Sequence, residues 1–343
     1  MRLHLFTKNF SHHSAHSGYD RLLDFVTASS ARLPKASAFL PNKYKTTLVE
    51  ACQAKWDHYG AAELNREIDL ISYTPFRKHL FHFLYGENTF CYSARLNRHN
   101  KVLVATYHQP ESWFNTTGHE RRKYFVSRIK ELDAVIAVSN DQADFFRQFN
   151  SNVYCVHHGI DTDFFSPPSI IETGTRHICQ FVGNWLRDFD TLINVINLLK
   201  LLAPNITVRV VTPEKNRPLF SGVEAEILSG ISDQELRETY KSASVVLLPL
   251  KDCTANNSAL EAMACGLPIV VTDIGGIRDY LTEECAVFCK PNDAEHMAAA
   301  VIDLCKNSDK RTGMGRVARE IAVSKFAWPI IGRKMLDVYK GLS

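Results

Sequence analysis

The chain has 343 residues, of which 45% are hydrophobic and 22% charged, an ordinary composition for a globular protein with room for two domains. Arg2 and Lys8 interrupt the N-terminal segment too early for a signal peptide, and no apolar run approaches the roughly 18 residues of a membrane-spanning helix. We therefore expect a cytoplasmic protein, whose nine scattered cysteines are free thiols.

Charge is unevenly distributed along the chain. Residues 1–150 contain 20 Lys and Arg against 14 Asp and Glu, whereas residues 151–343 contain 20 against 23. The basic first part either faces anionic lipid or an anionic acceptor, or is an ordinary solvated surface. Peripheral contact with a membrane therefore stays open, and we expect no nucleic-acid partner.

Short apolar runs alternate with polar or helical stretches in the first part of the chain. A strand is expected at Leu3–Thr7, a helix at about Tyr19–Ala28, and further strands at Lys101–Tyr107, Ala134–Ser139 and Val153–Val156. This alternation is typical of a parallel sheet that is covered by helices on both faces.

A boundary follows at residues 166–175, where two prolines precede polar and glycine-containing residues. Beyond it the alternation restarts. Strands are expected at His177–Val182, Thr207–Val211, Val245–Leu248 and Pro268–Thr272, and helices at Asp190–Leu202, at Asp233–Lys241 and from Leu260. The predicted fold class is therefore α/β, with two doubly wound domains in tandem and the cleft between them as the expected site.

One stretch late in the chain, Leu260–Asp273 followed by Gly275 and Gly276, strongly resembles the donor site of glycosyltransferase family 4, a family of retaining GT-B enzymes. Other segments resemble the family in the same order and spacing: Asp133–Ser139, His158–Phe164 and Lys325–Trp328. The resemblance implies two Rossmann-like domains that face each other across a cleft. Residues 1–166 would bind the acceptor, residues 167–325 the nucleotide sugar, and residues 326–343 would cross back to the first domain.

The resemblance also implies roles for individual residues of the donor site. Glu261 matches the glutamate whose carboxylate accepts hydrogen bonds from the two ribose hydroxyls. Asn256, Asn257 and Ser258 precede it, and their short polar side chains and turn-prone backbone suit phosphate oxygens. The alternative is that Glu261 merely complements a helix dipole.

Two positions depart from the family pattern. Cys253 stands where a second glutamate usually contacts the donor sugar, so this contact is either altered or made by Asp252. In the loop after the first strand of the second domain, Arg187 falls at the position of a family lysine and Asn184 replaces an arginine. A guanidinium can bind a diphosphate with two parallel hydrogen bonds. Alternatively, Arg187 pairs with Asp188 on the surface.

The remaining family positions are less specific. Ile231 lies in a turn that resembles the one whose backbone meets the base, so uracil, guanine and adenine are not distinguished. Gly18 permits close backbone approach in the loop after the first strand, and His108 resembles a histidine at the cleft edge. His12, His13 and His16 lack a carboxylate or cysteine partner at ligand spacing, so we expect solvated histidines rather than a metal site.

Together these resemblances imply a metal-independent hexosyltransferase that needs no cofactor and moves a sugar from a nucleotide diphosphate to a sugar, a lipid-linked or a small-molecule acceptor. The expected catalytic residues are His108, Arg187 and Glu261. The expected substrate-binding residues are Gly18, Asn184, Arg187, Ile231, Asp252, Cys253, Ala255, Asn256, Asn257, Ser258 and Glu261. Two alternatives remain, a GT-B nucleotide-sugar epimerase and a degenerate non-catalytic subunit.

Overall fold

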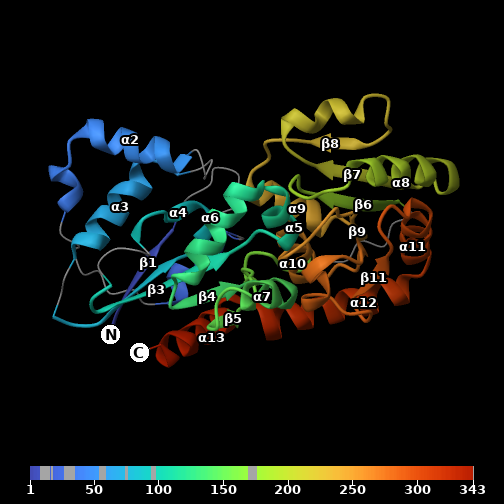
Figure 1. Ribbon diagram of the computed structural model, residues 1–343. Coiled ribbons are helices and arrows are strands. Elements are labelled where there is room, and N and C mark those ends of the chain that lie inside the picture. The colour runs from blue at the N-terminus through green and yellow to red at the C-terminus, as the bar shows by residue number, and fades with distance from the viewer. Residues whose placement is uncertain are drawn as a thin grey trace. The chain divides into compact units, whose positions relative to one another are not determined.

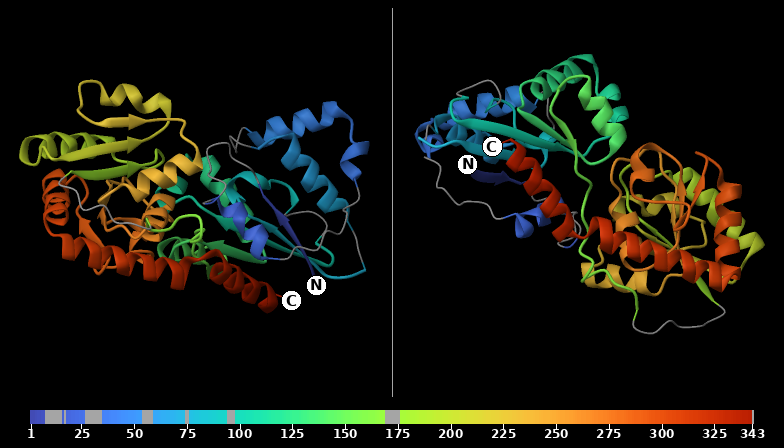
Figure 2. Two further views of the ribbon diagram at one scale, coloured as in Figure 1. Left: turned by 180° about the vertical axis from the view of Figure 1, so that it is seen from behind. Right: turned by 90° about the horizontal axis from the view of Figure 1, so that it is seen from below.

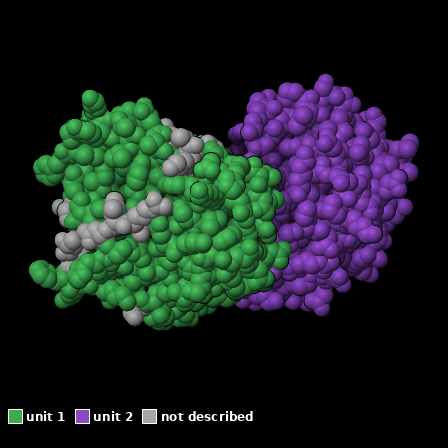
Figure 3. Space-filling model, in the orientation of Figure 1, with its two compact units in different colours: residues 1–13, 19–158, 331–343 green, residues 14–18, 159–330 purple. Residues whose placement is uncertain are grey.

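The computed structural model describes residues 1–7, 16, 18–26, 35–53, 59–73, 76–93, 98–168 and 176–342. The chain divides into two compact units, coloured separately in Figure 3. Unit 1 comprises residues 1–13, 19–158 and 331–343, and unit 2 comprises residues 14–18 and 159–330. Each unit contains its own parallel sheet with helices packed against it (Figures 1 and 2).

Unit 1 is built on a five-stranded parallel sheet in the order β1-β2-β3-β4-β5. Its strands are β1 (Arg2–Phe6), β2 (His79–Phe83), β3 (Lys101–Tyr107), β4 (Ala134–Ala137) and β5 (Val153–Cys155). Its longer helices are α2 (Asn42–Gln53), α3 (Ala61–Ser72), α5 (Glu111–Thr116), α6 (His119–Lys130) and α7 (Asn140–Arg147). Shorter turns are η1 (Tyr19–Arg21), α1 (Leu22–Phe25), η2 (Ala36–Phe39) and α4 (Gly86–Thr89). The expected strands β1, β3, β4 and β5 are confirmed.

We did not predict strand β2, although all five of its residues are buried. Two histidines interrupt its apolar pattern, and each has a buried partner. His79 Nδ1 lies 2.7 Å from His4 Nε2, and His82 is hydrogen-bonded to Thr106 and to Tyr339. Burial lowers the pKa of His82 to about 3, so this ring is neutral in the folded state. Satisfied, neutral histidines therefore occupy core positions that a hydrophobic pattern alone does not reveal.

Two cysteines of unit 1 correct the expectation that all nine are free thiols. Cys52 in α2 and Cys91 after α4 form a disulfide across 39 positions of sequence. The segment that contains Cys91 is also held by Glu67 of α3, whose carboxylate accepts hydrogen bonds from the backbone N–H groups of residues 91 to 93 at 2.6–2.7 Å. Spacing along the chain could not show that the fold brings Cys52 and Cys91 together.

Unit 2 is built on a six-stranded parallel sheet in the order β11-β10-β9-β6-β7-β8. Its strands are β6 (His177–Val182), β7 (Ile206–Val211), β8 (Glu226–Leu228), β9 (Val245–Leu248), β10 (Ile269–Thr272) and β11 (Ala286–Cys289). Its helices are α8 (Phe189–Leu202), η4 (Glu214–Phe220), α9 (Asp233–Lys241), α10 (Asn257–Ala264), η5 (Gly275–Asp279), α11 (Ala294–Lys306), α12 (Ser308–Ile321) and η6 (Ala322–Phe326). The expected strands and helices are all confirmed, although α10 begins at Asn257 rather than at Leu260.

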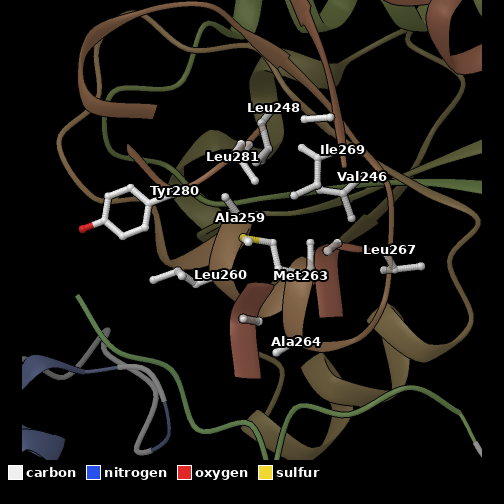
Figure 4. Packing of buried hydrophobic residues seen from close by; sticks show 14 of the residues in the cluster. Val246, Leu248, Ala259, Leu260, Met263, Ala264, Leu267, Ile269, Tyr280 and Leu281 are labelled. Carbon is white, nitrogen blue, oxygen red and sulfur yellow. The ribbon is translucent and has the colours of Figure 1, made fainter. Parts of the chain in front are cut away.

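The sheet of unit 2 has a hydrophobic core on each face. Alternate residues of β9 enter the two cores, because successive side chains of a strand point to opposite sides. Val246 and Leu248 pack with Ala259 and Met263 of α10 (Figure 4). Val245 and Leu247 pack in the second core, together with apolar residues of α8 and α11. The strand order reverses between β6 and β9, which is where open α/β sheets bind ligands.

The last helix, α13 (Trp328–Gly341), begins in unit 2 and ends in unit 1. We expected the units to meet at 166/167 and the C-terminal return to begin at 326, whereas the contacts divide the chain at 158/159 and assign residues from Ile331 to unit 1. Two segments quoted for the family resemblance contact each other here. Ile160 exchanges backbone hydrogen bonds with Phe326 and Trp328, and a Cβ atom at Gly159 would lie 2.4 Å from the Trp328 ring.

Candidate functional site

The candidate site of unit 2 begins with two loops at the carboxyl ends of β6 and β9. Arg187 pairs with Leu250 in an isolated antiparallel bridge, and Lys251 N–H donates to the Leu186 carbonyl at 2.9 Å. The turn requires two unusual backbone conformations, a φ of 120° at Gly183 and of 56° at Leu186. These contacts fix the loop after β6 against the loop that leads to α10.

Arg187 lies between these loops and α10. Its Nε donates to the Val182 carbonyl at 3.1 Å and its Nη1 to the Trp185 carbonyl at 3.3 Å. Its Nη2 donates to Asn256 Oδ1 at 3.2 Å and to Ser258 Oγ at 3.0 Å. A guanidinium has five N–H groups, so these four bonds leave one N–H of Nη1, rather than the two parallel donors that we expected for a diphosphate.

The surface ion pair that we considered for Arg187 is not formed. Asp188 instead caps α8, where its carboxylate accepts hydrogen bonds from the N–H and the hydroxyl of Thr191. Among the residues that the structure describes, no carboxylate forms an ion pair with Arg187, and burial lowers the pKa of its guanidinium. The site therefore contains a cation whose charge is not neutralised by direct pairing, as expected where an anion binds.

Gly183 makes room for this cation. A Cβ atom at this position would lie 2.6 Å from Nη2 of Arg187, closer than atoms can approach. Thr212 donates to the Gly183 carbonyl at 3.0 Å and accepts from Asn216, and Asn216 also donates to Asn184 Oδ1 at 2.6 Å. This bond holds the side chain of Asn184 in the loop after β6. Its Oδ1 accepts the bond from Asn216, and its Nδ2 points away from Asn216.

Helix α10 brings several predicted residues to the same place. The Asn256 side chain caps the helix by accepting from Ala259 N–H at 3.1 Å, and Ser258 Oγ donates to the Val182 carbonyl at 3.1 Å. Asn257 begins the helix and, like Ala255, is half-buried. Two of the residues predicted to surround phosphate, Asn256 and Ser258, therefore contact Arg187 directly, and Ser258 also contacts the end of β6.

Glu261 lies in the second turn of α10 rather than at its beginning. It is buried, and its Oε2 accepts the hydroxyl proton of Tyr240 at 2.8 Å. Burial and the neighbouring Glu261 raise the pKa of Tyr240 well above its usual value, so Tyr240 donates at all physiological pH values. Sequence reasoning missed Tyr240, because α9 shows it only as one apolar residue of an amphipathic helix.

Cys253 and Asp252 differ in their surroundings. Cys253 is buried, and burial raises the pKa of its thiol to about 12, so the sulfur is protonated and unreactive. Asp252 is half-buried, and its Oδ1 accepts the Cys253 N–H at 2.7 Å. A Cβ atom at Gly275 would lie 2.2 Å from the Cys253 carbonyl oxygen, so only glycine fits beside this turn.

Two further features belong to loops of unit 2. Ile231 is half-buried between Gly230, which has a φ of 66°, and Ser232, which caps α9. Trp185 is 58% exposed in the loop after β6, and its carbonyl accepts from Arg187. We did not single out Trp185, although an exposed tryptophan in a loop at the carboxyl end of a parallel strand offers an aromatic surface for stacking.

In unit 1, His108 follows β3 and is half-buried. Its Nε2 lies 2.8 Å from the Leu84 carbonyl, so this nitrogen carries the proton, and its ring packs against Tyr19 and Tyr85 with centroids 4.7 and 4.9 Å away. The His108 N–H donates to Glu87 Oε1 at 2.9 Å. These contacts position the histidine at the carboxyl end of its strand.

Glu87, which sequence reasoning missed, is 3% exposed. Its Oε2 has no hydrogen-bond partner among the described residues, and burial raises the pKa of its carboxyl to about 7. A glutamate that directly follows Gly86 at the end of a parallel strand is a signal that could have identified it.

We expected His16 to be a solvated histidine without a carboxylate partner, which is wrong, because it is half-buried and contacts two residues of unit 2. His16 Nδ1 lies 2.9 Å from Asp161 Oδ2, and its ring stacks on Phe164. Gly18 is buried two positions later, while His12 and His13 lie outside the described residues. Within the described part of the chain, no group of three or more His, Cys, Asp or Glu side chains is arranged to hold a metal ion. No described helix is both long and apolar enough to cross a membrane.

Two protein-family models match the chain. "Glycosyltransferase Family 4" matches residues 56–164, which lie in unit 1 up to residue 158 and in unit 2 beyond it. "Glycosyl transferases group 1" matches residues 176–307, which lie in unit 2. The two matches follow each other along the chain in the order of the two units.

Curated proteins with related sequences include alpha-maltose-1-phosphate synthase of Mycolicibacterium smegmatis, 26% identical over 272 residues, which cover 69% of this chain and 67% of that protein. D-inositol 3-phosphate glycosyltransferase of Saccharomonospora viridis is 28% identical over 243 residues, 62% of this chain and 56% of that protein. Phosphatidyl-myo-inositol mannosyltransferase of Propionibacterium freudenreichii is 26% identical over 257 residues, with shares of 70% and 64%. The match therefore spans between 56% and 67% of these relatives.

Solved structures show the same fold. Sucrose-phosphate synthase from Thermosynechococcus elongatus has a TM-score of 0.68 at 18% identity, covering 91% of this chain and 82% of that one. Anabaena HepE in complex with UDP has a TM-score of 0.68 at 13% identity, covering 81% and 82%. At these identities the likeness concerns the fold alone.

Proposed function

Since the chain belongs to the glycosyltransferases of family 4 type and has the GT-B fold, we propose that it transfers a sugar from a nucleotide diphosphate donor to a hydroxyl acceptor with retention of anomeric configuration. A hexose is the sugar class that we propose. The two alternatives, an epimerase and a non-catalytic subunit, are not favoured by the family matches.

The observation that carries the proposal is Arg187, a cation without a carboxylate partner among the described residues. It lies at the carboxyl end of β6, where the strand order reverses, and contacts Asn256 and Ser258 at the start of α10. A helix N-terminus adds partial positive charge and N–H donors at the same place. We propose that the donor diphosphate binds here, with the remaining N–H of Arg187 and the amide nitrogen of Asn184 as further donors.

Glu261 is the proposed acceptor for the ribose hydroxyls. An ionised carboxylate offers about four lone-pair positions, and Tyr240 uses one of them. The bond to Tyr240 fixes the orientation of the carboxylate before the nucleotide binds, which reduces the entropy lost on binding. The backbone around Ile231 is proposed to meet the base.

The donor sugar is proposed to contact Asp252 rather than Cys253. Asp252 is half-buried and carries a carboxylate, whereas the Cys253 thiol is buried, protonated and a weak hydrogen-bonding group. Ala255 lies in the same loop. With this assignment the donor sugar still contacts a carboxylate, although Cys253 replaces the glutamate of the family pattern.

The proposed reaction breaks the bond between the anomeric carbon and the β-phosphate oxygen, and forms a bond from the same face to the acceptor oxygen. The acceptor proton passes to the leaving phosphate, so no side-chain nucleophile is required. Arg187, Asn184 and the start of α10 stabilise the charge that grows on the diphosphate. His108 is proposed to bind the donor sugar or an acceptor oxygen, and Gly18 to allow close approach of the substrate. No metal is required because protein groups supply the positive charge.

The acceptor is proposed to be a sugar, a lipid-linked molecule or a small alcohol. The names of two relatives, which describe an inositol phosphate and a phosphatidyl-inositol as the glycosylated molecules, make both soluble and lipid-linked acceptors worth testing. The basic first part of the chain is consistent with a cytoplasmic enzyme that contacts a membrane peripherally.

A ligand screen tests this function. A donor that binds only the folded state raises the melting temperature, so UDP-, GDP- and ADP-sugars are compared by thermal shift. UDP-sugars come first, because the HepE structure holds UDP. The stabilising donor is then incubated without an acceptor. Slow release of free sugar supports the transferase, epimerised sugar supports the epimerase, and binding without any turnover supports the non-catalytic subunit.

A further inference from the structure

A groove on the surface of unit 1 lies apart from the site described above. It has a volume of about 340 Å³ and follows one face of helix α6, which is labelled in Figure 1. His119, Arg122, Lys123, Val126 and Lys130 line it, at the spacing that places residues on one side of a helix. Phe149, which follows α7, also lines it. This volume is at the lower end of the range of small-molecule sites.

Several cations border the groove, although most of its lining surface is apolar. Among the described residues, its lining contains Arg122, Lys123, Lys130 and His119 and no carboxylate. Glu131, directly after α6, pairs with Arg128, whereas Glu120 in the first turn of α6 is exposed and does not belong to the lining. Among the described residues neither Lys123 nor Lys130 forms an ion pair. Several unneutralised cations along one hollow attract an anion, and phosphate is one of the anions that Arg and Lys bind well.

One of these cations is already held in place. Arg122 Nε donates to Asn115 Oδ1 of α5 at 3.1 Å, and its guanidinium carbon lies 6.0 Å from the centre of the Phe149 ring. Phe149 in turn packs against Phe145, with ring centroids 5.3 Å apart. A guanidinium that is fixed before binding loses less conformational entropy when it contacts an anion.

The groove also has an apolar part. Val126 and the ring of Phe149 are both half-buried, so each exposes carbon surface between the cations. Inorganic phosphate would leave this surface unused, whereas an ester with an apolar substituent would cover it. The chemistry of the groove thus matches a ligand with two parts, a phosphate and an apolar group.

We infer that the α6 groove binds a phosphate ester that carries an apolar group, by contacts of the phosphate with Arg122, Lys123 and Lys130 and of the apolar group with Val126 and Phe149. The inference does not depend on the proposed transferase activity, because all these residues belong to unit 1 and the Arg187 site belongs to unit 2. The phosphate ester comes either from a soluble metabolite or from a lipid head group.

The test compares two double variants of the full chain. Lys123→Gln with Lys130→Gln removes two charges from the groove, and Lys43→Gln with Lys45→Gln removes the same charge from α2 in the same unit. Binding of phenyl phosphate and methyl phosphate is measured by titration calorimetry, and binding to phosphatidylcholine vesicles with and without phosphatidylglycerol by co-sedimentation. Circular dichroism confirms that each variant is folded.

We expect phenyl phosphate to bind the unmodified chain more tightly than methyl phosphate, and the groove variant to weaken phenyl phosphate binding by roughly five- to tenfold, from two partly exposed charges. The α2 variant should change it less than twofold. Loss in the groove variant with phenyl phosphate identifies a soluble ligand, and loss with anionic vesicles alone identifies a lipid head group. Equal effects of both variants, or no effect of either, would overturn the inference, and equal affinity for the two esters would refute its apolar part.

Discussion

The hydroxyl of Tyr240 donates a hydrogen bond to Oε2 of Glu261 at 2.8 Å, between two side chains that are both buried in unit 2. This bond connects α9 to α10 and orients the carboxylate that we assign to the ribose. Replacing Tyr240 by phenylalanine removes this hydroxyl and keeps the ring. The change therefore separates the effect of orienting the Glu261 carboxylate from the effect of removing it.

We predict that Glu261→Ala weakens nucleotide binding by about 1.5–3 kcal/mol, the usual contribution of hydrogen bonds to a charged group. Tyr240→Phe should weaken it less, because the carboxylate stays but is no longer held. Titration calorimetry with UDP, GDP and ADP measures both effects, and thermal unfolding checks that each variant is folded. Unchanged affinity for all three nucleotides in a folded Glu261→Ala protein would remove Glu261 from the site.

Arg187→Ala should lower turnover by roughly a hundredfold or more, as the loss of one preorganised donor to a developing charge typically does. Arg187→Lys should restore part of the rate, since the charge returns without the planar fork. Steady-state rates decide this, with Arg278→Ala as a control that removes an exposed arginine paired with Asp273. Turnover near the native value in Arg187→Ala would favour the non-catalytic alternative.

Gly183→Ala tests the same site without changing any charge. The new methyl group would displace the Arg187 guanidinium, which lies 2.6 Å from the ideal Cβ position. Gly222→Ala is the control, because its φ of 79° is also positive and, among the described residues, no atom lies within 4 Å of the new Cβ. We expect both variants to lose stability and only Gly183→Ala to lose turnover beyond that. Equal activity of the two at a temperature where both are folded would contradict the role of this contact.

We predict that turnover survives treatment with EDTA. In the proposed mechanism Arg187 and the start of α10 provide the positive charge that a divalent ion supplies in other transferases. The rate is measured before and after chelation, and again after Mg²⁺ or Mn²⁺ is added back. A rate that falls on chelation and returns with either ion would show that a metal takes part.

Glu87 should make the stability of the protein depend on pH. Burial raises the pKa of its carboxyl from 4.5 to about 7, so the folded state favours the neutral form. Its contribution to stability is fully present below pH 4.5 and is lost as the pH rises from 4.5 to 7, because the unfolded chain ionises first. The loss amounts to about 3.5 kcal/mol at most, at about 1.4 kcal/mol per pH unit.

Urea unfolding of the native protein and of Glu87→Gln between pH 4.5 and 8 measures this effect. The amide side chain of this variant would keep an acceptor for His108 N–H and would not ionise, so the native protein should lose stability relative to the variant as the pH rises. Glu111→Gln, an exposed position, serves as control. Parallel stability curves for native protein and Glu87→Gln would show that Glu87 is already ionised in this range.

The fold of unit 2 could be predicted closely from the sequence, because its strands are short apolar runs between clear helix signals. β6 and α9 have the predicted bounds, and β9 does as well. We missed β2 because His79 and His82 are polar residues, which a hydrophobic pattern excludes from a core. In the structure each of them is hydrogen-bonded to a buried partner. A pattern of residue types does not contain the partners that make such residues compatible with a core.

The candidate site was predictable only in part for a similar reason. The motif placed Asn256, Ser258 and Glu261 together, since they are neighbours on one helix. The contact of Arg187 with Asn256 spans 69 positions of sequence, and Tyr240 and Glu261 meet across 21. Such pairs form through the register of separate strands and loops, and so do the disulfide of Cys52 with Cys91 and the contact of Glu87 with His108.

Unit 1 consists of three separate stretches of chain, the last of which is residues 331–343. The ribosome adds these residues after the segment 159–330 of unit 2. Unit 1 therefore cannot be completed until unit 2 has been synthesised. Tyr339, whose hydroxyl is hydrogen-bonded to His82 of β2 in the unit 1 sheet, belongs to residues 331–343. Until they are added, β2 lacks one of the groups that satisfy its buried histidine. A nascent chain should therefore expose an incomplete unit 1 to chaperones for the full time that unit 2 takes to emerge.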